Sequence, residues 1–330
     1  MKKKRVQEKT IRPPEIKYTH ISIIFGLLIF TCILMSVITD NFFSTKNLTG
    51  MTRNFMETAL LALPMTFIIL TNSIDLSVSG TVAMCAIFLA KINLVTGNIV
   101  LAIAITVITG ILAGALNGVV VGYIKIPSFI ATLATMFMYG GIAQGVSQAE
   151  TLTGLPKTFY ILGSGYFLGL PIQLWIFAVA AILFSFVLRR TEYGRNLRVI
   201  GFNPESAVYA GINVAKVHLI NYVVSGAMAA LAALIFVSRI SAAKSNAGVG
   251  YETDAIIAVV LGGTSISGGY GTVEGTILGI LLVGILRNGL TLARVSSEIT
   301  TIILGMLLLL TIIISGNTGG GVIKKHKKEK

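Results

Sequence analysis

Long apolar runs alternate with short polar breaks along almost the whole chain. A helix that crosses a membrane needs roughly 20 apolar residues, and we expect about ten of these runs to be transmembrane helices. Several runs are short, so one of them is a candidate for a broken or half helix. The pattern predicts an all-α fold, a polytopic membrane helical bundle. The runs cover approximately residues 21–38, 58–71, 80–92, 98–124, 129–145, 174–188, 218–237, 251–263, 272–290 and 299–314.

The composition agrees with this pattern. The chain has 330 residues, of which 54% are hydrophobic and 12% are charged, and its mean hydropathy is +0.85. Soluble domains carry about 25% charged residues. About ten spans of about 20 residues each take up about 200 residues, so only short loops and tails remain. The composition therefore excludes a separate soluble catalytic domain.

The basic residues form three clusters, which together explain most of the net charge of +13. They lie in residues 1–17, 189–198 and 324–330, beside apolar runs, as is typical of cytoplasmic segments. Anionic lipid headgroups also attract such clusters. With the amino terminus inside, six spans and then four more place all three clusters in the cytoplasm. No basic face is interleaved with aromatic residues, so we expect no nucleic-acid partner.

This topology divides the chain into three parts. We expect a basic cytoplasmic tail at residues 1–20, a transmembrane domain at 21–315 and a second basic cytoplasmic tail at 316–330. A cytoplasmic loop at about 189–217 interrupts the transmembrane domain.

Glycine recurs every four residues in two runs. Such faces let helix backbones approach closely in lipid. They predict tight helix packing or, alternatively, a gliding surface for alternating access. The glycines are Gly110, Gly114, Gly118 and Gly122 in one run and Gly271, Gly275 and Gly279 in the other.

A weak internal likeness points to a possible repeat. Leu70 and Gly80-Thr81-Val82 match Leu261 and Gly271-Thr272-Val273, and Asn117-Gly118 matches Asn288-Gly289 in a different register. The relation between the two halves stays open. Transporters are often built from repeats, with the substrate near their interface.

Asp75 lies in a polar break between two apolar runs. At the bilayer centre an aspartate costs about 2.5–3.5 kcal/mol on insertion scales, so Asp75 must lie near the surface, be paired or face a cavity. Asp75 either caps the start of a helix or acts directly in transport. The two roles are compatible, because broken helices often line the transport pathway.

Further polar positions occur within or beside the apolar runs. Each can bond a neighbouring helix, its own helix or a hydroxyl-rich solute. The candidate substrate-pathway residues are Asn72, Asp75, Ser77, Asn117, Thr132, Thr135, Asn221 and Ser225.

The chain carries no recognisable catalytic, cofactor or metal motif. Cys32 and Cys85 lie inside apolar runs, and the three histidines are far apart. The glycine-rich residues 262–269 lack the Lys-Ser/Thr ending of a phosphate loop. We therefore expect no cofactor, no bound metal and no enzyme activity of its own.

Three stretches resemble the membrane permeases of ribose-type ABC sugar importers, and the likeness covers about residues 50–315. Where that family usually has two glycines before Ile-Asp, this chain has Asn72-Ser73, which adds hydrogen-bonding groups or stiffens the break. The first stretch is MTFIILTNSIDLSV at 65–78, and the second is ALNG at 115–118 followed by KIPSFIATL at 125–133. The third comprises GR at 194–195, GFNPESA at 201–207, AGI at 210–212, NAGVGYE at 246–252 and VLGGTS at 260–265.

The resemblance implies a permease subunit of the bacterial cytoplasmic (inner) membrane that moves a monosaccharide or a similar small polyhydroxylated solute by alternating access. It also implies a cytoplasmic ABC ATPase subunit, an extracytoplasmic substrate-binding protein and a second permease copy, identical or not. The 189–217 loop would dock into the ATPase, although its arginines could instead serve only to anchor the topology. The matching loop positions are Arg195, Arg198, Asn203, Glu205, Ala207, Ala210 and Gly211.

The alternative class is an ion-coupled secondary carrier, which would need ionisable residues within the membrane. By sequence, Asp75 is nearly the only such residue. A passive channel and a membrane enzyme rank below it. Residues 62–66 and 168–171 resemble the autoinducer-2 and rhamnose branches of the importer family, without distinguishing these solutes from ribose.

Overall fold

A computed structural model of the chain describes the backbone of residues 18–319 and the side chains of residues 22–311. Most of the two expected basic tails therefore lies outside the described residues. The helices are α1 (Tyr18–Ile38), α2 (Thr45–Leu70), α3 (Val78–Thr96), α4 (Ile99–Gly122), α5 (Ser128–Ser147), α6 (Ile161–Ser164), α7 (Ile172–Arg190), α8 (Glu192–Phe202), α9 (Pro204–Tyr209), α10 (Val214–Ile240), α11 (Tyr251–Leu261), α12 (Val273–Leu292) and α13 (Ser297–Gly319). A 3-10 helix, η1 (Lys157–Tyr160), and a two-stranded antiparallel hairpin of β1 (Tyr166–Phe167) and β2 (Leu170–Pro171) complete the elements.

Each predicted apolar run lies in a helix, which confirms the all-α polytopic bundle. Within the described part of the chain, α2, α3, α4, α5, α7, α10 and α12 are the seven helices long and apolar enough to cross a membrane. Two shorter apolar stretches, 22–38 and 297–311, belong to α1 and α13. The predicted half helix corresponds to α11, which has 11 residues.

Two segments expected to be polar connections are helical instead. Residues 45–57 form the first half of α2, because the Ser44 hydroxyl accepts the Asn47 N–H and starts the helix early. The 189–217 loop contains α8 and α9, which are capped in the same way by Thr191 and Asn203. Local capping outweighs the low hydropathy that led to the prediction of loops.

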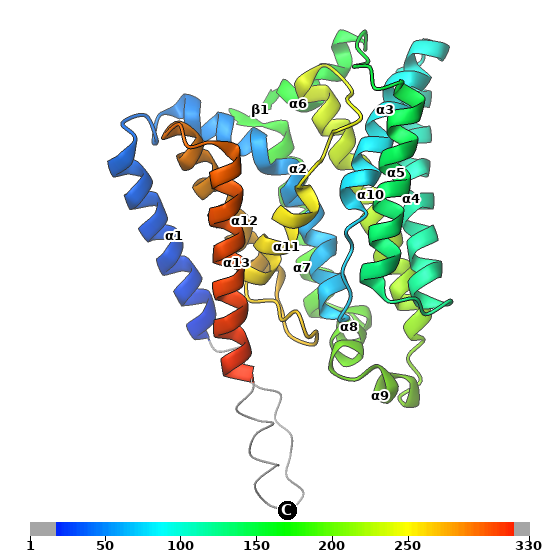
Figure 1. The fold of residues 1–330 in the computed structure, drawn as a ribbon, viewed down its shortest axis with the longest axis vertical. Helices are drawn as coiled ribbons and strands as arrows, with labels where there is room; N and C mark the ends of the chain where they lie inside the picture. The colour runs from blue at the N-terminus through cyan, green and yellow to red at the C-terminus, as the bar shows by residue number, and fades with distance from the viewer. Residues whose placement is uncertain (1–17, 320–330) are drawn as a thin grey trace, which may run out of the picture.

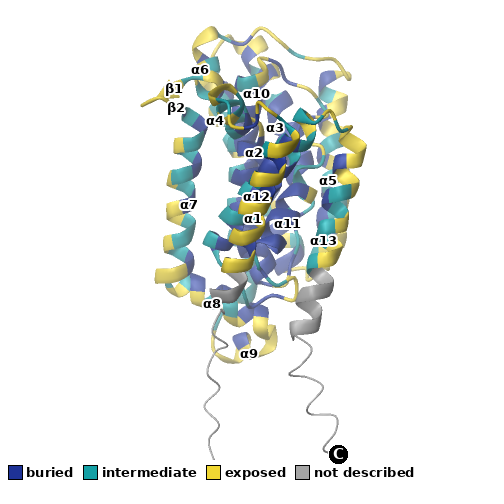
Figure 2. Cartoon of the chain, turned by 90° about the vertical axis from the view of Figure 1, so that its left-hand side faces the viewer, coloured by how far each residue is buried: buried dark blue, intermediate teal, exposed yellow. Residues whose placement is uncertain are grey.

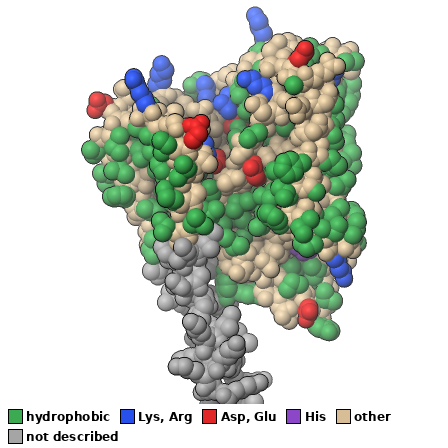
Figure 3. Space-filling view, in the orientation of Figure 1, with side chains coloured by type: hydrophobic (Ala, Val, Ile, Leu, Met, Phe, Trp, Pro, Cys, Tyr) green, Lys and Arg blue, Asp and Glu red, His purple; other side chains and the backbone are tan. Residues whose placement is uncertain are grey.

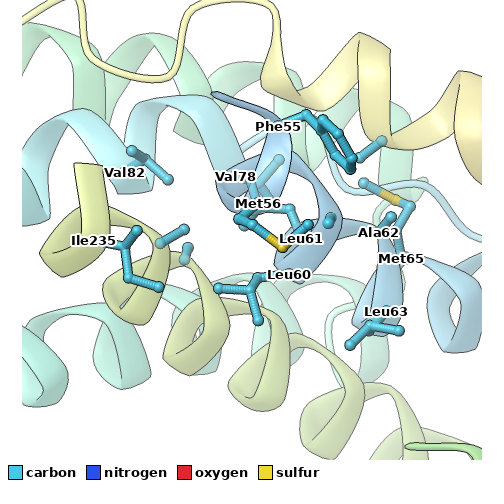
Figure 4. Packing of buried hydrophobic residues seen from close by; sticks show 14 of the residues in the cluster. Phe55, Met56, Leu60, Leu61, Ala62, Leu63, Met65, Val78, Val82 and Ile235 are labelled. Carbon is cyan, nitrogen blue, oxygen red and sulfur yellow. The ribbon is translucent and has the colours of Figure 1, made fainter. Parts of the chain in front are cut away.

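The helices form a central layer covered by more exposed helices. Within the 18-residue apolar window of each helix, 83% of the residues of α2 are buried, compared with 22% of those of α7. Figure 2 shows this contrast as a dark blue interior behind helices with yellow outer faces. Figure 4 shows Leu60 and Leu61 of α2 packed among Val78, Val82 and Ile235. A layer of this kind leaves the outer apolar faces for lipid.

The repeated glycines lie where helix backbones approach closely, as the tight-packing prediction requires. A Cβ added at Gly110 of α4 would lie 2.4 Å from the carbonyl oxygen of Gly226 in α10. A Cβ added at Gly279 of α12 would lie 1.9 Å from the carbonyl oxygen of Ala258 in α11. Any larger residue would force these helix pairs apart.

Two helices stop inside the bundle. The α2 helix ends at Leu70 and the chain runs without helix to Val78, while α11 ends at Leu261 and the next helix starts at Val273. The sequence likeness paired Leu70 with Leu261, and both are helix ends. The following helix starts, Val78 and Val273, do not correspond in the same way.

The first described residues of α1, the last of α13 and the whole of α8 and α9 lie at one end of the bundle (Figure 1). The opposite end holds α6 and the β1–β2 hairpin. The basic cluster at 189–198 therefore lies at the same end as the first described residues of α1 and the last of α13, while the two terminal clusters lie outside the described residues.

Candidate functional site

Asp75 lies at the centre of a buried polar network in the gap between α2 and α3. Its side chain is only 1% exposed. Its Oδ1 accepts bonds from the N–H and the hydroxyl of Ser77, at 3.0 and 2.6 Å, and its Oδ2 accepts the Ser225 hydroxyl at 2.7 Å. Three donors therefore satisfy a carboxylate that ion pairs with no described residue.

The network continues into α4 and α5. The Asn117 amide donates to the Ser77 hydroxyl at 2.7 Å, and the Thr135 hydroxyl donates to the Asn117 carbonyl oxygen at 2.8 Å. Five of the predicted pathway residues thus form one chain of hydrogen bonds, from α10 through the break to α5. A fully satisfied network of this kind holds its helices in one arrangement.

The backbone of Ile74 is held by a second set of contacts. Its N–H donates to the Ser128 hydroxyl at 3.1 Å, and its carbonyl accepts from Tyr222 at 3.0 Å and from Thr132 at 3.4 Å. Non-helical backbone at membrane depth is tolerated only where its polar groups find such partners.

Asn72 and Asn221 lie outside the Asp75 network. Asn72 is exposed and its φ of +56° is left-handed, a conformation that asparagine and glycine adopt most readily. Asparagine therefore suits this position without the strain that most other side chains would meet. The amide oxygen of Asn221 accepts the Tyr193 hydroxyl at 2.7 Å, and burial raises the pKa of Tyr193, which keeps this donor protonated.

The two helix breaks meet at the end of α8. The Gly269 N–H donates to the Leu70 carbonyl at 2.9 Å, and a Cβ added at Gly201 would lie 1.8 Å from the same carbonyl. Beside them the Phe202 ring meets the Tyr270 ring edge-on, with centroids 4.5 Å apart. The α8 helix therefore contacts both breaks directly.

The predicted ATPase-coupling residues lie in α8, in α9 and in the residues directly after each of these helices. Arg195, Asn203, Glu205, Ala210 and Gly211 are exposed, and Arg198 is half-buried. Ala207 is fully buried, so its methyl group cannot contact a partner in this arrangement. Asn203 caps α9 by accepting the Ser206 N–H at 3.0 Å.

The expectation that Asp75 is nearly the only ionisable residue within the spans is wrong. Glu57 of α2 is fully buried and bonds Arg239 of α10 at 2.8 Å. Asp254 of α11 pairs with Arg287 of α12 at 2.6 Å. A third pair joins Glu274 of α12 to Arg189 of α7 at 2.8 Å.

Sequence reasoning missed these pairs because the residues lie inside or at the edge of an apolar run and each partner is distant in sequence. Glu57 and Arg239 are 182 residues apart. The available signal was a charged residue inside or beside an apolar helix, which is costly without a partner. No group of three or more His, Cys, Asp or Glu that could hold a metal is present among the described residues.

The fold and this site define a class. A polytopic helical bundle with two helices interrupted inside it, and with buried polar groups at the interruptions, is the architecture of a membrane transport protein.

Comparison with known proteins identifies the family. Residues 47–312 match the family described as the permease component of the branched-chain amino acid transport system. The chain is 39% identical over 277 residues to the ribose import permease protein RbsC of Haemophilus influenzae, covering 83% of this chain and 86% of that protein. It is 36% identical over 262 residues to the autoinducer 2 import system permease protein LsrD of Yersinia enterocolitica, covering 78% and 79%. No solved structure matches this chain significantly.

The chain therefore belongs to this family of transport permeases. It is a multi-pass membrane subunit of the ribose-type ABC class, and ATP hydrolysis belongs to a separate partner subunit. The family also implies a substrate-binding protein as a further component.

Proposed function

We propose that this permease moves a monosaccharide or a similar small polyhydroxylated solute across the bacterial cytoplasmic membrane by alternating access. The relatives are named for ribose import and for autoinducer 2 import.

The observation that carries the mechanism is the contact of α8 with both helix breaks. In this proposal α8 and α9 dock into the cytoplasmic ATPase. The α9 helix offers Val208 and Tyr209, which are 59% and 92% exposed, as an uncovered apolar tip. Glu205 and Gly211 lie beside it and are also exposed.

A movement of α8 and α9 would act directly on the two interrupted helices, α2 and α11, because α8 contacts both breaks. Gly201 lies against the Leu70 carbonyl and the Gly269 N–H, so a displacement of α8 shifts both interrupted helices together. The Asp75 network would then be the rigid part that carries this shift into α4, α5 and α10.

The positions of the remaining partners can be inferred from the same membrane topology. We infer that both termini and α8–α9 face the cytoplasm, where the basic clusters contact anionic lipid headgroups. A second permease copy, identical or not, completes the membrane core. The substrate-binding protein docks at the opposite end, at the β1–β2 hairpin and its surroundings.

The test is ATP-dependent uptake of D-ribose, L-rhamnose and autoinducer 2 by proteoliposomes that hold this chain, its ATPase and its binding protein. A Glu205→Arg variant should assemble but lose most uptake. Asp40→Arg, the same reversal of charge at an exposed site in the connection between α1 and α2, is the control and should transport normally.

Uptake of none of the three solutes would overturn the proposed substrate class. Uptake driven by an ion gradient without the ATPase would overturn the mechanism and would favour the ion-coupled carrier, with Asp75 as its coupling site.

A further inference from the structure

A cavity of about 550 Å³ lies between α13 and the packed helices α2, α11 and α12. This volume falls within the range of small-molecule sites, about 300–1,000 Å³. None of the predicted pathway residues lines it. Its lining includes Asn54, Phe55, Tyr251, Asp254, Arg287 and Thr301.

The cavity lies toward the end away from α8 and α9. Arg287 is 14 residues beyond the start of α12 at Val273, which is about 21 Å at the helical rise of about 1.5 Å per residue. The start of α12 follows Tyr270, which contacts Phe202 of α8. Figure 3 shows most of the charged side chains of this face gathered at the same far end.

Asp254 and Arg287 supply the charged groups of the cavity. They pair at 2.6 Å, so together they present an acceptor and a donor with no net charge. The Nε of Arg287 is buried and has no hydrogen-bond partner among the described residues. A buried donor without a partner is destabilising, and an acceptor on a bound solute would supply the missing hydrogen bond.

Hydroxyl groups and aromatic rings form the other walls. Thr58, Thr253, Ser297 and Thr301 line the cavity beside the amide of Asn54. Hydroxyl and amide groups both donate and accept, which matches the hydroxyls of a sugar. Phe55 and Tyr251 add apolar surface for the C–H face of a sugar ring.

We propose that this cavity is a binding site for a neutral polyhydroxylated solute, held between the Asp254–Arg287 pair and the hydroxyls of α13. This proposal rests on the proposed function, and it names the cavity where the transported solute would bind. A solute released by the binding protein would occupy this cavity before it reaches the helix breaks. An anionic solute is disfavoured because Asp254 faces the same space as Arg287.

Gly305 allows the cavity to be filled without disturbing the fold. It lines the cavity, and a Cβ added there would meet no atom within 4 Å. A Gly305→Leu variant should raise the KM for D-ribose uptake about ten-fold, which corresponds to a loss of about 1.4 kcal/mol of binding. Gly141→Leu, on the exposed face of α5 and equally unobstructed, should leave the KM unchanged.

Direct occupancy is tested by protection of an introduced thiol. In a Cys32→Ser, Cys85→Ala background, Thr301→Cys should react with a methanethiosulfonate reagent more slowly when D-ribose is present. Ser164→Cys, exposed and outside the cavity, should react at the same rate with and without the sugar.

The outcomes separate this site from the proposed function. Wild-type uptake of D-ribose with no protection at Thr301→Cys and an unchanged KM in Gly305→Leu would overturn the site and leave the function standing. A wild-type complex that transports none of the tested sugars would overturn the function itself, and with it the assignment of a sugar to this cavity.

Discussion

The carbonyl of Leu70 accepts the N–H of Gly269 at 2.9 Å, and this bond joins the two points at which helices stop inside the bundle. Gly201 at the end of α8 packs against the same bond. Three segments that are far apart in sequence therefore meet at one backbone contact. This contact links the proposed ATPase-docking surface to the interrupted helices.

Replacement of Gly201 by alanine should damage transport more than assembly. The new Cβ would lie 1.8 Å from the Leu70 carbonyl and 2.3 Å from the Gly269 nitrogen, so backbone must move. Overpacking of this kind costs about 1–3 kcal/mol. We expect a lower melting temperature in detergent and a loss of most ATP-driven uptake.

The matched control is Gly145→Ala on α5, where a Cβ meets nothing within 4 Å. This variant should be unchanged or more stable by about 0.5–1 kcal/mol. Normal uptake by the Gly201→Ala variant would show that the junction does not transmit movement.

Loss of the Ser225 hydroxyl should destabilise the Asp75 network. A hydrogen bond to a charged group contributes about 1.5–3 kcal/mol, and the Ser225 hydroxyl donates to Asp75 at 2.7 Å. Ser225→Ala should lower the free energy of unfolding in detergent by that amount. In an Asp75→Asn background the same substitution should cost less, because the two residues are coupled.

A double-mutant cycle on these two residues measures the coupling. Ser164→Ala, at an exposed hydroxyl away from Asp75, is the control and should have almost no effect. Equal costs of Ser225→Ala in both backgrounds would contradict a charged Asp75 held by this donor.

The buried Glu57–Arg239 pair should be costly to break on one side only. Removal of one partner of a buried ion pair costs about 3–5 kcal/mol, because the other charge stays buried. Arg239→Met should therefore destabilise the protein strongly, and Glu57→Met in the same chain should restore much of the loss. Denaturant unfolding in detergent measures both variants.

Arg189→Met provides the comparison, because Arg189 and Glu274 form a pair that is more exposed to the surroundings. Exposed pairs contribute about 0–1 kcal/mol, so this variant should be only slightly affected. A similar loss at both sites would argue against an effect of burial.

The exposed tip of α9 should be needed for binding of the ATPase. Tyr209→Asp places a charge on the apolar surface proposed to enter the partner, and we expect the ATPase to be lost on co-purification. Leu168→Asp changes an apolar residue that is also largely exposed, in the turn of the β1–β2 hairpin at the opposite end. It should keep the ATPase, and loss of the ATPase from both variants would point to misfolding.

The sequence alone determined the class of protein and the approximate positions of its helices. The bilayer sets the length of an apolar run, so each run could be recognised without its neighbours. Asp75 was singled out for a similar reason, because a charge between apolar runs is costly wherever its partners are. The break after Leu70 was visible as the polar stretch around Asp75, whereas its correspondence with the break after Leu261 was visible only as a weak likeness.

The tertiary structure alone decided which polar residues meet. Asp75, Ser77, Asn117, Thr135 and Ser225 form one network, whereas Asn72 and Asn221 do not belong to it. A hydropathy pattern gives the length of a helix, but its rotation and its neighbours depend on how all helices pack. The pairing of Asp254 with Arg287, and the cavity that they line, follow from that packing.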